Sequence, residues 1–388
     1  MTTAAPTTSF WTTLPQPILG LSPMDGVTDA AFRLIAARHG RPDLIMTEFT
    51  HVEGICRGIP AVLRNLDYHP DERPVVAQVF GSEPEAFYKA AHVVAALGFD
   101  GLDINMGCPD KAVAGHGCGA ALIRTPDRAQ AIIRAAQSGM RDWADGRDLA
   151  SVGLAAETRD IVRRMMARVG ASDHVRRALP VSVKTRLGYD RVVIDSWIDA
   201  LLETEPAAIS VHGRTLAQRY SGDADWDAIA RAAERTRRTA TLALGNGDLR
   251  SPSDVVRRVR ETHVHGVLIG RAAMGNPWIF RVADRLRAAC ADPASPAPAP
   301  PVVDSADRWA VAREHAALFE RLRDHVPFTV MRKHLGWYVR GPEDRPGLRA
   351  RLMQVRTLAE LDAVLTDATP RAEAGTRESA RVASMTCG

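Results

Sequence analysis

One cysteine stands out among the residues that could carry chemistry. Cys108 lies between Gly107 and Pro109, directly after a short β-branched run, in the segment DINMGCPDKAV (103–113). A turn of this kind holds a side chain away from the core. A thiol with an ordinary pKa of about 8.5 stays protonated at neutral pH, which suits a general acid, and Cys108 could also serve as a nucleophile. Cys118, in a glycine-rich segment, has no such placement.

A lysine and a histidine stand at the ends of two later runs of the same kind, and two glycine segments stand at the ends of two more. Lys184 can offset negative charge on a ring or a phosphate, and His212 can donate hydrogen bonds to it. The glycine segments are GNGD (245–248) and IGR (269–271). Glycines let a backbone approach an anion closely. Either segment alone is compatible with an ordinary tight turn, but the two together favour a phosphorylated cofactor or substrate.

These residues need a scaffold that brings the ends of several strands together. Short β-branched runs, each followed by a loop and a helical pattern, predict strands at residues 18–21, 44–47, 75–80, 101–105, 181–185, 208–211, 241–244 and 267–269. Eight such units over roughly 265 residues are typical of a TIM barrel. In that fold the functional side chains follow the C-terminal ends of the strands, and all of the residues named above fall there.

The fold prediction is therefore an α/β protein, a TIM (β/α)8 barrel followed by a small C-terminal helical domain. The barrel spans residues 18–290 after a flexible N-terminus (1–17). Surplus residues near 138–179 predict a helical insertion, for which we have no functional account. A Pro- and Ala-rich linker (291–303) leads to a helical domain (304–365) and a disordered tail (366–388).

Composition excludes several classes of protein. No run of about 18 apolar residues predicts a membrane span, and the first seventeen residues do not resemble a secretory signal. The 5 cysteines are too scattered for a disulfide framework and none has zinc-site spacing, so we expect no metal and a cytoplasmic location. A net charge of +4 is compatible with an RNA partner without requiring one.

Taken together, these segments resemble the tRNA-dihydrouridine synthases. The matching segments are SPMDGVTDAAFR (22–33), AQVFGSEPEAF (77–87), DINMGCPDKAV (103–113), VKTRLG (183–188), VHGRT (211–215), GNGD (245–248) and IGRAAMGNPWIF (269–280). The segment MRKHLGWYVRG (331–341) resembles part of the family's C-terminal RNA-binding domain. The family usually begins its first motif with Ala, where this chain has Ser22.

The resemblance implies an FMN-dependent enzyme that reduces uridine to 5,6-dihydrouridine in tRNA, without an obligate protein partner. NADPH would reduce FMN, hydride would pass from reduced FMN to C6 of uracil, and Cys108 would donate a proton to C5. The implied cofactor contacts are Pro23, Met24, Gln78, Lys184, His212, Asn246, Gly247, Asp248, Gly270 and Arg271. Asn105 would contact the uracil. Candidate RNA phosphate contacts are Arg186, Arg214, Arg219, Arg332, Lys333 and Arg340.

Three alternatives stay open at the level of sequence. The same chemistry could act on ribosomal RNA, or a flavin barrel could act on a small pyrimidine, although the latter would not need the helical domain. A catalytically idle RNA-binding protein is the third. No GxGxxG unit is present, so the sequence does not distinguish NADPH from NADH as the reductant.

Overall fold

The computed structural model describes residues 9–109, 117–171, 176–340 and 347–368. The chain divides into two compact units, Met1–Val302 and Val303–Gly388. Each unit is described by itself.

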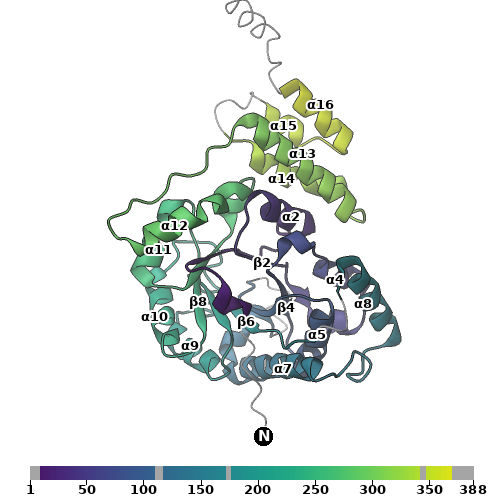
Figure 1. Ribbon diagram of the computed structural model, residues 1–388, viewed down its shortest axis with the longest axis vertical. Helices are drawn as coiled ribbons and strands as arrows, with labels where there is room; N and C mark the ends of the chain where they lie inside the picture. Colours follow the sequence, from purple (N-terminus) through teal and green to yellow (C-terminus); the bar gives the residue numbers. More distant parts are fainter. Residues whose placement is uncertain (1–8, 110–116, 172–175, 341–346, 369–388) are drawn as a thin grey trace, which may run out of the picture. The chain divides into compact units, whose positions relative to one another are not determined.

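The first unit is a closed parallel barrel surrounded by helices (Figure 1). Its strands are β1 (Ile18–Leu21), β2 (Leu44–Met46), β4 (Val75–Phe80), β5 (Gly101–Met106), β6 (Val181–Arg186), β7 (Ala208–His212), β8 (Leu242–Asn246) and β9 (Gly266–Ile269). The sheet closes because β1 pairs with both β2 and β9, and β2 also pairs with β4. This confirms the predicted barrel. The strand that the sequence missed, β3 (Thr50–His51), has two residues and pairs with β4.

Helices cover the outside of the barrel and start at residues suited to that position. They are α2 (Ala30–His39), α5 (Pro84–Ala96), α7 (Pro126–Ala144), α9 (Ile194–Leu202), α10 (Trp226–Thr236), α11 (Pro252–Thr262) and α12 (Ala283–Ala291). The Asp29 and Asp225 side chains accept hydrogen bonds from the first turns of α2 and α10, and Ser251 forms a capping box with Asp254 at α11.

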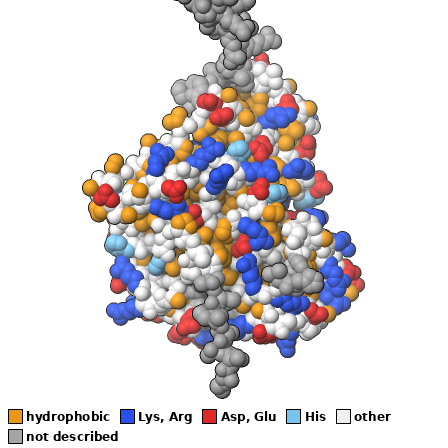
Figure 2. Space-filling view, in the orientation of Figure 1, with side chains coloured by type: hydrophobic (Ala, Val, Ile, Leu, Met, Phe, Trp, Pro, Cys, Tyr) orange, Lys and Arg blue, Asp and Glu red, His pale blue; other side chains and the backbone are white. Residues whose placement is uncertain are grey.

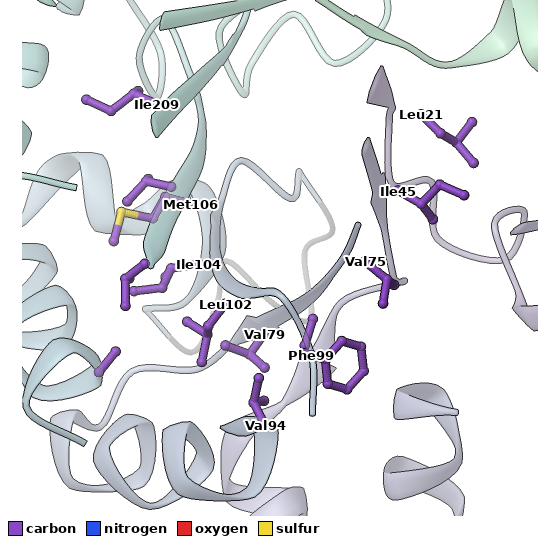
Figure 3. Close-up of a cluster of buried hydrophobic side chains, with 14 of the residues drawn as sticks. Leu21, Ile45, Val75, Val79, Val94, Phe99, Leu102, Ile104, Met106 and Ile209 are labelled. Carbon is purple, nitrogen blue, oxygen red and sulfur yellow. The ribbon is translucent and has the colours of Figure 1, made fainter. Parts of the chain in front are cut away.

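The alternation of side chains along each strand produces two cores. Outward-facing aliphatic residues such as Val79, Leu102 and Ile104 pack against the helices, as Figure 3 shows for the region beside α5. Inward-facing residues such as Leu44 and Leu244 fill the N-terminal part of the barrel. The C-terminal part of the interior is polar instead, and it holds the candidate site.

A short helix, α1 (Phe10–Thr13), precedes the barrel. Its Trp11 is 1% exposed and belongs to the inner core with Ile18 and Leu44. Residues 9–17 are therefore ordered, which corrects the predicted flexible N-terminus for that part; residues 1–8 lie outside the described residues. A single aromatic residue in a Thr- and Pro-rich segment gives no periodic signal, so the sequence did not show that this end of the barrel receives a Trp.

The surplus residues near 138–179 include the end of α7 and a further helix, α8 (Ala156–Val169). Val162, Met165 and Met166 on α8 are buried and join the outer core near α5. Short helical segments fill other loops: α3 (Val52–Cys56), α4 (Pro60–Leu63), η1 (Arg64–Leu66), η2 (Pro70–Glu72), η3 (Gly119–Arg124), η4 (Arg271–Ala273) and η5 (Pro277–Val282).

The second unit is helical over its described residues, as predicted. Its elements are α13 (Ser305–Leu322), η6 (Phe328–Met331), α14 (Arg332–Tyr338), α15 (Leu348–Leu352) and α16 (Leu358–Ala368). Phe319, Leu335, Leu352 and Leu361 are each 0% exposed and form its core. Because α16 runs to Ala368, the first three residues of the predicted tail are helical, and residues 369–388 lie outside the described part. None of the described helices has the length and apolar character needed to cross a membrane.

Candidate active site

A row of polar side chains lines the barrel interior near the C-terminal ends of the strands. In the strand register Gln78 is paired with Asp103, Asn105 with Lys184, and His212 with Asn246. Paired residues in a parallel sheet face the same side, so the register brings these side chains together inside the barrel. Six residues that follow different local patterns in the sequence thus share one end of the barrel, which we call the mouth.

The turn that carries Cys108 is held by hydrogen bonds from two directions. Asn105 Oδ1 accepts from the backbone N–H of Gly107 (3.0 Å) and of Cys108 (2.8 Å). Arg186 Nε donates to the carbonyl of Gly107 at 2.6 Å. Cys108 itself is 8% exposed. The turn is therefore fixed before any ligand binds.

Arg186 and Arg214 are buried, which differs from the exposed positions expected of RNA phosphate contacts. Arg186 is 3% exposed and also donates to the carbonyls of Thr215 (3.0 Å) and Arg219 (3.1 Å). Arg214 is 2% exposed and donates to the carbonyls of Ser221 and Gly222. Both guanidinium groups therefore brace the loop after β7. A sequence pattern cannot distinguish an arginine that braces a loop from one that faces solvent.

Lys184 is partly buried and lies beside a carboxamide rather than a carboxylate. Its Nζ donates to Asn246 Oδ1 at 3.3 Å, and Asn246 Nδ2 donates to the carbonyl of Leu268 at 2.7 Å. Burial, and secondarily the nearby Arg186, lowers the pKa of Lys184 to about 8. The ammonium group is therefore charged at neutral pH but loses its proton more easily than an exposed lysine.

His212 lies among cations. Burial is the main cause that lowers the pKa of His212 to about 2, and the positive charges of Arg186, Lys184, Arg214 and Arg271 add to it. The imidazole is therefore neutral at physiological pH. Its Nε2 is 3.4 Å from Arg214 Nη1.

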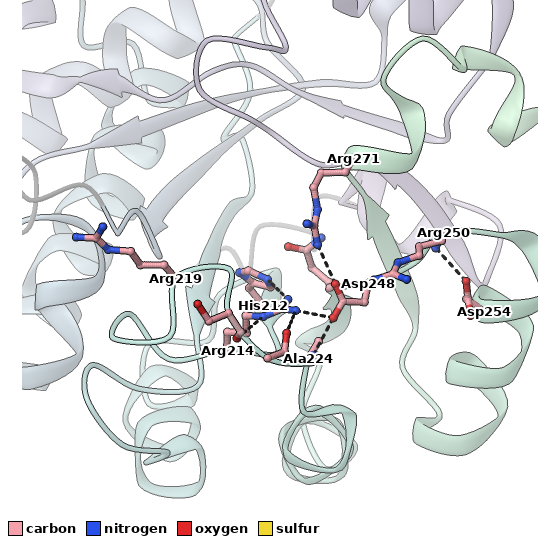
Figure 4. Close-up of polar contacts among 12 residues, drawn as sticks. His212, Arg214, Arg219, Ala224, Asp248, Arg250, Asp254 and Arg271 are labelled. Atoms are coloured by element: carbon pink, nitrogen blue, oxygen red, sulfur yellow. Dashed lines mark hydrogen bonds and ion pairs between the residues drawn. The ribbon is translucent and has the colours of Figure 1, made fainter. Parts of the chain in front are cut away.

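Asp248 connects two of these arginines (Figure 4). Its carboxylate accepts from Arg214 (2.6 Å), from Arg271 (2.8 Å) and from the backbone N–H of Ala224 (2.9 Å). Burial raises the pKa of this carboxyl, but the hydrogen bonds from Ala224 and Arg214 outweigh burial, so that the pKa is below its usual value. Arg214 is buried, whereas the Arg271 side chain is 56% exposed. Asp248 thus holds an accessible guanidinium in a fixed orientation.

Two glycines keep the loops after β8 and β9 close to their neighbours. Gly247 has a φ of 130°, and a Cβ there would lie 2.7 Å from the Ala224 Cβ. A Cβ on Gly270 would lie 3.3 Å from the sulfur of Met24. Met24 and Pro23 are partly exposed on the loop after β1. The loops predicted to contact a cofactor therefore meet at the mouth.

Two predicted contacts lie in the helical unit. Arg332 begins α14 and donates to the carbonyls of Val355 (2.7 Å) and Gln354 (2.9 Å). Lys333 is partly exposed on the same helix.

Sequence reasoning missed Asp103, which is 0% exposed. Its carboxylate accepts from Ser182 Oγ (2.6 Å) and from Gln78 Nε2 (2.8 Å). Burial raises its pKa to about 6, against the opposing effect of those two hydrogen bonds and of Lys184. The two-residue alternation along β5 was the available signal, because it places Asp103 on the same inward face as Asn105.

A parallel β/α barrel with a thiol turn and several cations at its mouth defines an enzyme scaffold. Among the described residues, no group of three or more His, Cys, Asp and Glu side chains could hold a metal ion. The family described as "Dihydrouridine synthase (Dus)" matches residues 20–142 and 155–373.

Curated relatives agree with this match. The chain is 32% identical over 366 residues to "Probable tRNA-dihydrouridine synthase" of Staphylococcus aureus (strain COL), covering 92% of this chain and 94% of that protein. It is 36% identical over 279 residues to "Probable tRNA-dihydrouridine synthase 2" of Bacillus subtilis (strain 168), covering 71% and 74%. The chain belongs to the dihydrouridine synthase family, and it is an oxidoreductase.

Proposed function

We propose that the protein reduces uridine to 5,6-dihydrouridine in tRNA, with FMN as resident cofactor and NADPH as reductant. The observation that supports this most strongly is the fixed turn that presents the thiol of Cys108 at a cation-lined barrel mouth in a member of this family. The proposed substrate implies a cytoplasmic location.

The positive charge at the mouth supports the binding of an anionic flavin nucleotide. Lys184, Arg186, Arg214 and Arg271 all act on His212, and Asp248 balances only part of that charge. Glycines 247 and 270 let the loops after β8 and β9 pack closely against Ala224 and Met24, which brings their backbone to the mouth. An anion bound here would relieve the repulsion among the cations.

We assign the cofactor contacts as follows. Pro23 and Met24 would line the ring system, Gln78 would hydrogen-bond to it, and Lys184 would lie against its pyrimidine edge. The phosphate side would be held by His212, Asn246, Gly247, Gly270 and Arg271. A carboxylate repels a phosphate, so Asp248 would contribute by orienting Arg271 rather than by direct contact.

The chain's own residues account for the proton and the charge in the reaction. A bound, reduced flavin supplies hydride to C6 of the uracil ring. The thiol of Cys108 donates its proton to C5, so that the C5–C6 double bond is saturated, and solvent then reprotonates the thiolate. The positive charge of Lys184 stabilises that thiolate electrostatically. Asn105 Nδ2 donates one N–H to Gln78, which leaves a second N–H for the uracil.

The uridine must leave its stack to reach the mouth, and the RNA must be held while it does so. Basic and acidic side chains are interspersed on the face in view in Figure 2, and the net charge is only +4, so local groups rather than net charge must provide the affinity. We assign this role to the helical unit through Arg332 and Lys333, which are partly exposed, whereas Arg186 and Arg214 are buried. We assign Arg186 and Arg214 to bracing the mouth instead.

The test is conversion of RNA by the purified protein. We expect a yellow protein that, with NADPH and unmodified tRNA, gives a product with a two-hydrogen mass gain on uridine. Ribosomal RNA and free pyrimidine nucleosides serve as parallel substrates. Conversion of ribosomal RNA or of a free pyrimidine without conversion of tRNA would overturn the proposed substrate, and a colourless protein with no flavin affinity would overturn the chemistry.

A further inference from the structure

A chain of hydrogen bonds connects a buried acid to the turn that carries Cys108. Gln78 Nε2 donates to Asp103 Oδ2 at 2.8 Å, and Asn105 Nδ2 donates to Gln78 Oε1 at 3.0 Å. Asn105 Oδ1 then accepts from the backbone N–H groups of Gly107 and Cys108. The chain crosses from β5 to β4 and back, because Asp103 and Asn105 are both inward-facing on β5 while Gln78 is paired with Asp103.

This chain of hydrogen bonds runs in one donor-to-acceptor direction, and Asp103 sets that direction. An ionised carboxylate only accepts hydrogen bonds, so Gln78 must turn its NH₂ group towards Asp103 and its oxygen towards Asn105. Asn105 must then turn its NH₂ group towards Gln78. Its oxygen is left facing the turn, where two N–H groups need an acceptor. If either carboxamide were reversed, donors would face donors.

We propose that Asp103 is a positioning residue: as an obligate acceptor it fixes the orientation of Gln78 and Asn105, and through them the turn that presents Cys108. This rests on the proposed function for the role of Cys108 as proton donor, whereas the positioning itself rests on the hydrogen bonds alone. Asp103 contacts neither substrate nor cofactor in this assignment.

The burial of Asp103 supports a role beyond packing. Burying a carboxylate is costly unless its hydrogen bonds compensate, and Asp103 is 0% exposed. One layer deeper in the barrel, Val76, Leu244 and Leu268 show that apolar side chains fill the interior. Ser182 Oγ supplies the second hydrogen bond to the carboxylate, so that both oxygens are occupied.

Two isosteric substitutions test the direction of the chain. Asp103→Asn introduces a donor, which can face the Ser182 hydroxyl because a hydroxyl also accepts; the amide oxygen then stays with Gln78, but the direction of the hydrogen-bond chain is no longer enforced. Asn105→Asp places carboxylates at both ends of Gln78, whose single NH₂ group can serve only one. The double variant Asp103→Asn/Asn105→Asp reverses the chain: Asn donates to the oxygen of Gln78, the NH₂ of Gln78 donates to Asp, and Asp still accepts from both turn N–H groups.

The readout is alkylation of Cys108 by iodoacetamide in the full-length purified protein, followed by mass spectrometry of the Cys108 peptide. A pH profile separates the thiol pKa, which the new charge at position 105 will alter, from the limiting rate at high pH, which reports the geometry of the turn. Alkylation of Cys118 and Cys290 provides internal controls for global unfolding. Ser182→Ala is the matched control variant, because it removes a hydrogen bond to Asp103 without changing the chain's direction.

We expect Asn105→Asp to change the limiting rate by about tenfold, in line with one mismatched buried hydrogen bond, and Asp103→Asn to change it by no more than about threefold, because Ser182 can accept from the new NH₂ group. The double variant returns it to within about threefold of wild type, and Ser182→Ala stays within about twofold of wild type. An unchanged limiting rate in Asn105→Asp, or a double variant whose change is the product of the two single changes, overturns the proposal. If a single variant does not fold, Gln78→Met breaks the same chain without moving a charge, and an unchanged limiting rate there also overturns it.

This assay uses neither RNA nor NADPH, so it separates two failures. If the alkylation rate is restored in the double variant but the wild type does not convert tRNA uridine, the positioning role stands and the proposed function is wrong. If the wild type converts tRNA uridine but the alkylation rate is not restored in the double variant, the proposed function stands and the positioning role is wrong.

Discussion

Arg186 Nε donates a 2.6 Å hydrogen bond to the carbonyl of Gly107, the residue that precedes Cys108. An arginine predicted as an RNA contact is thus part of the support of the thiol turn. Asn105 holds the amides of the same turn, so that the carbonyl and the N–H groups are fixed by different strands.

The position of Arg186 predicts a split between kcat and KM. We expect Arg186→Gln to lower kcat with tRNA by at least about tenfold, because a displaced turn affects the chemical step, and to change KM little. Arg332→Gln on α14 should instead raise KM and change kcat little. Steady-state kinetics on unmodified tRNA measure both. A rise in KM at constant kcat for Arg186→Gln would show that it contacts the RNA directly.

The pair formed by Asp248 and Arg271 predicts a specific loss of flavin affinity. Arg271→Gln removes a charged donor that is 56% exposed at the mouth, and we expect the Kd of FMN to rise by about tenfold or more. Titration of the apoprotein with FMN, followed by flavin fluorescence, measures this. Arg250→Gln changes an exposed arginine nearby and should leave the Kd unchanged. Equal effects of both substitutions would indicate a general charge effect rather than a site at Arg271.

The raised pKa of Asp103 predicts an acid limb in the activity. Burial raises the pKa of this carboxyl to about 6, and the hydrogen-bond chain requires the ionised form, so kcat/KM should fall as the pH drops below about 6. The charged group that acts on Asp103 is Lys184, whose own pKa of about 8 places its titration on the alkaline side. The Ser182 hydrogen bond lowers the pKa of Asp103, so Ser182→Ala should move the acid limb to higher pH. A limb at the same pH in both proteins would assign it to another group.

Ionisation of the Asp103 carboxyl affects stability and activity in opposite directions: activity requires the ionised form, whereas the fold is more stable with the protonated form. A carboxyl whose pKa is higher in the folded than in the unfolded state stabilises the fold below its unfolded pKa of about 3.9, and this contribution is lost as the pH rises through about 6.

Trp11 predicts that the segment before β1 contributes to stability. Trp11→Ala should lower the free energy of unfolding by about 3–5 kcal/mol, because it empties a site in the inner core. Thr13→Ala on the same short helix is exposed and should change it by no more than about 0.5 kcal/mol. Chemical denaturation of the two variants checks this. A small effect of Trp11→Ala would mean that the barrel core closes without this residue.

The sequence predicted the barrel because strands and helices leave local patterns. Each predicted strand is present, with ends shifted by up to two residues. β3 was missed because two residues are too short to show any alternation. Cys108 follows β5, Lys184 lies in the last half of β6 and His212 is the last residue of β7, so the pattern of strands alone places them at one end of the barrel.

Contacts between strands far apart in the sequence were not predictable in the same way. The hydrogen bond from Gln78 to Asp103 depends on the register between β4 and β5, which no local pattern specifies. Likewise, the exposure of Arg186 and Arg214 depends on how the loop after β7 folds back over them. The sequence shows that positions 186 and 214 carry positive charges, but it does not show which groups these side chains contact.

The most direct test of the central claim compares Cys108→Ala with Cys118→Ala, a nearby cysteine that is also buried. Both variants should bind FMN and oxidise NADPH. In single turnovers with unmodified tRNA, Cys118→Ala should form dihydrouridine at the wild-type rate, whereas Cys108→Ala should be slower by about a hundredfold or more. Conversion by Cys108→Ala at the wild-type rate would contradict the assignment of the proton donor, and no conversion by the wild type would contradict the proposed function itself.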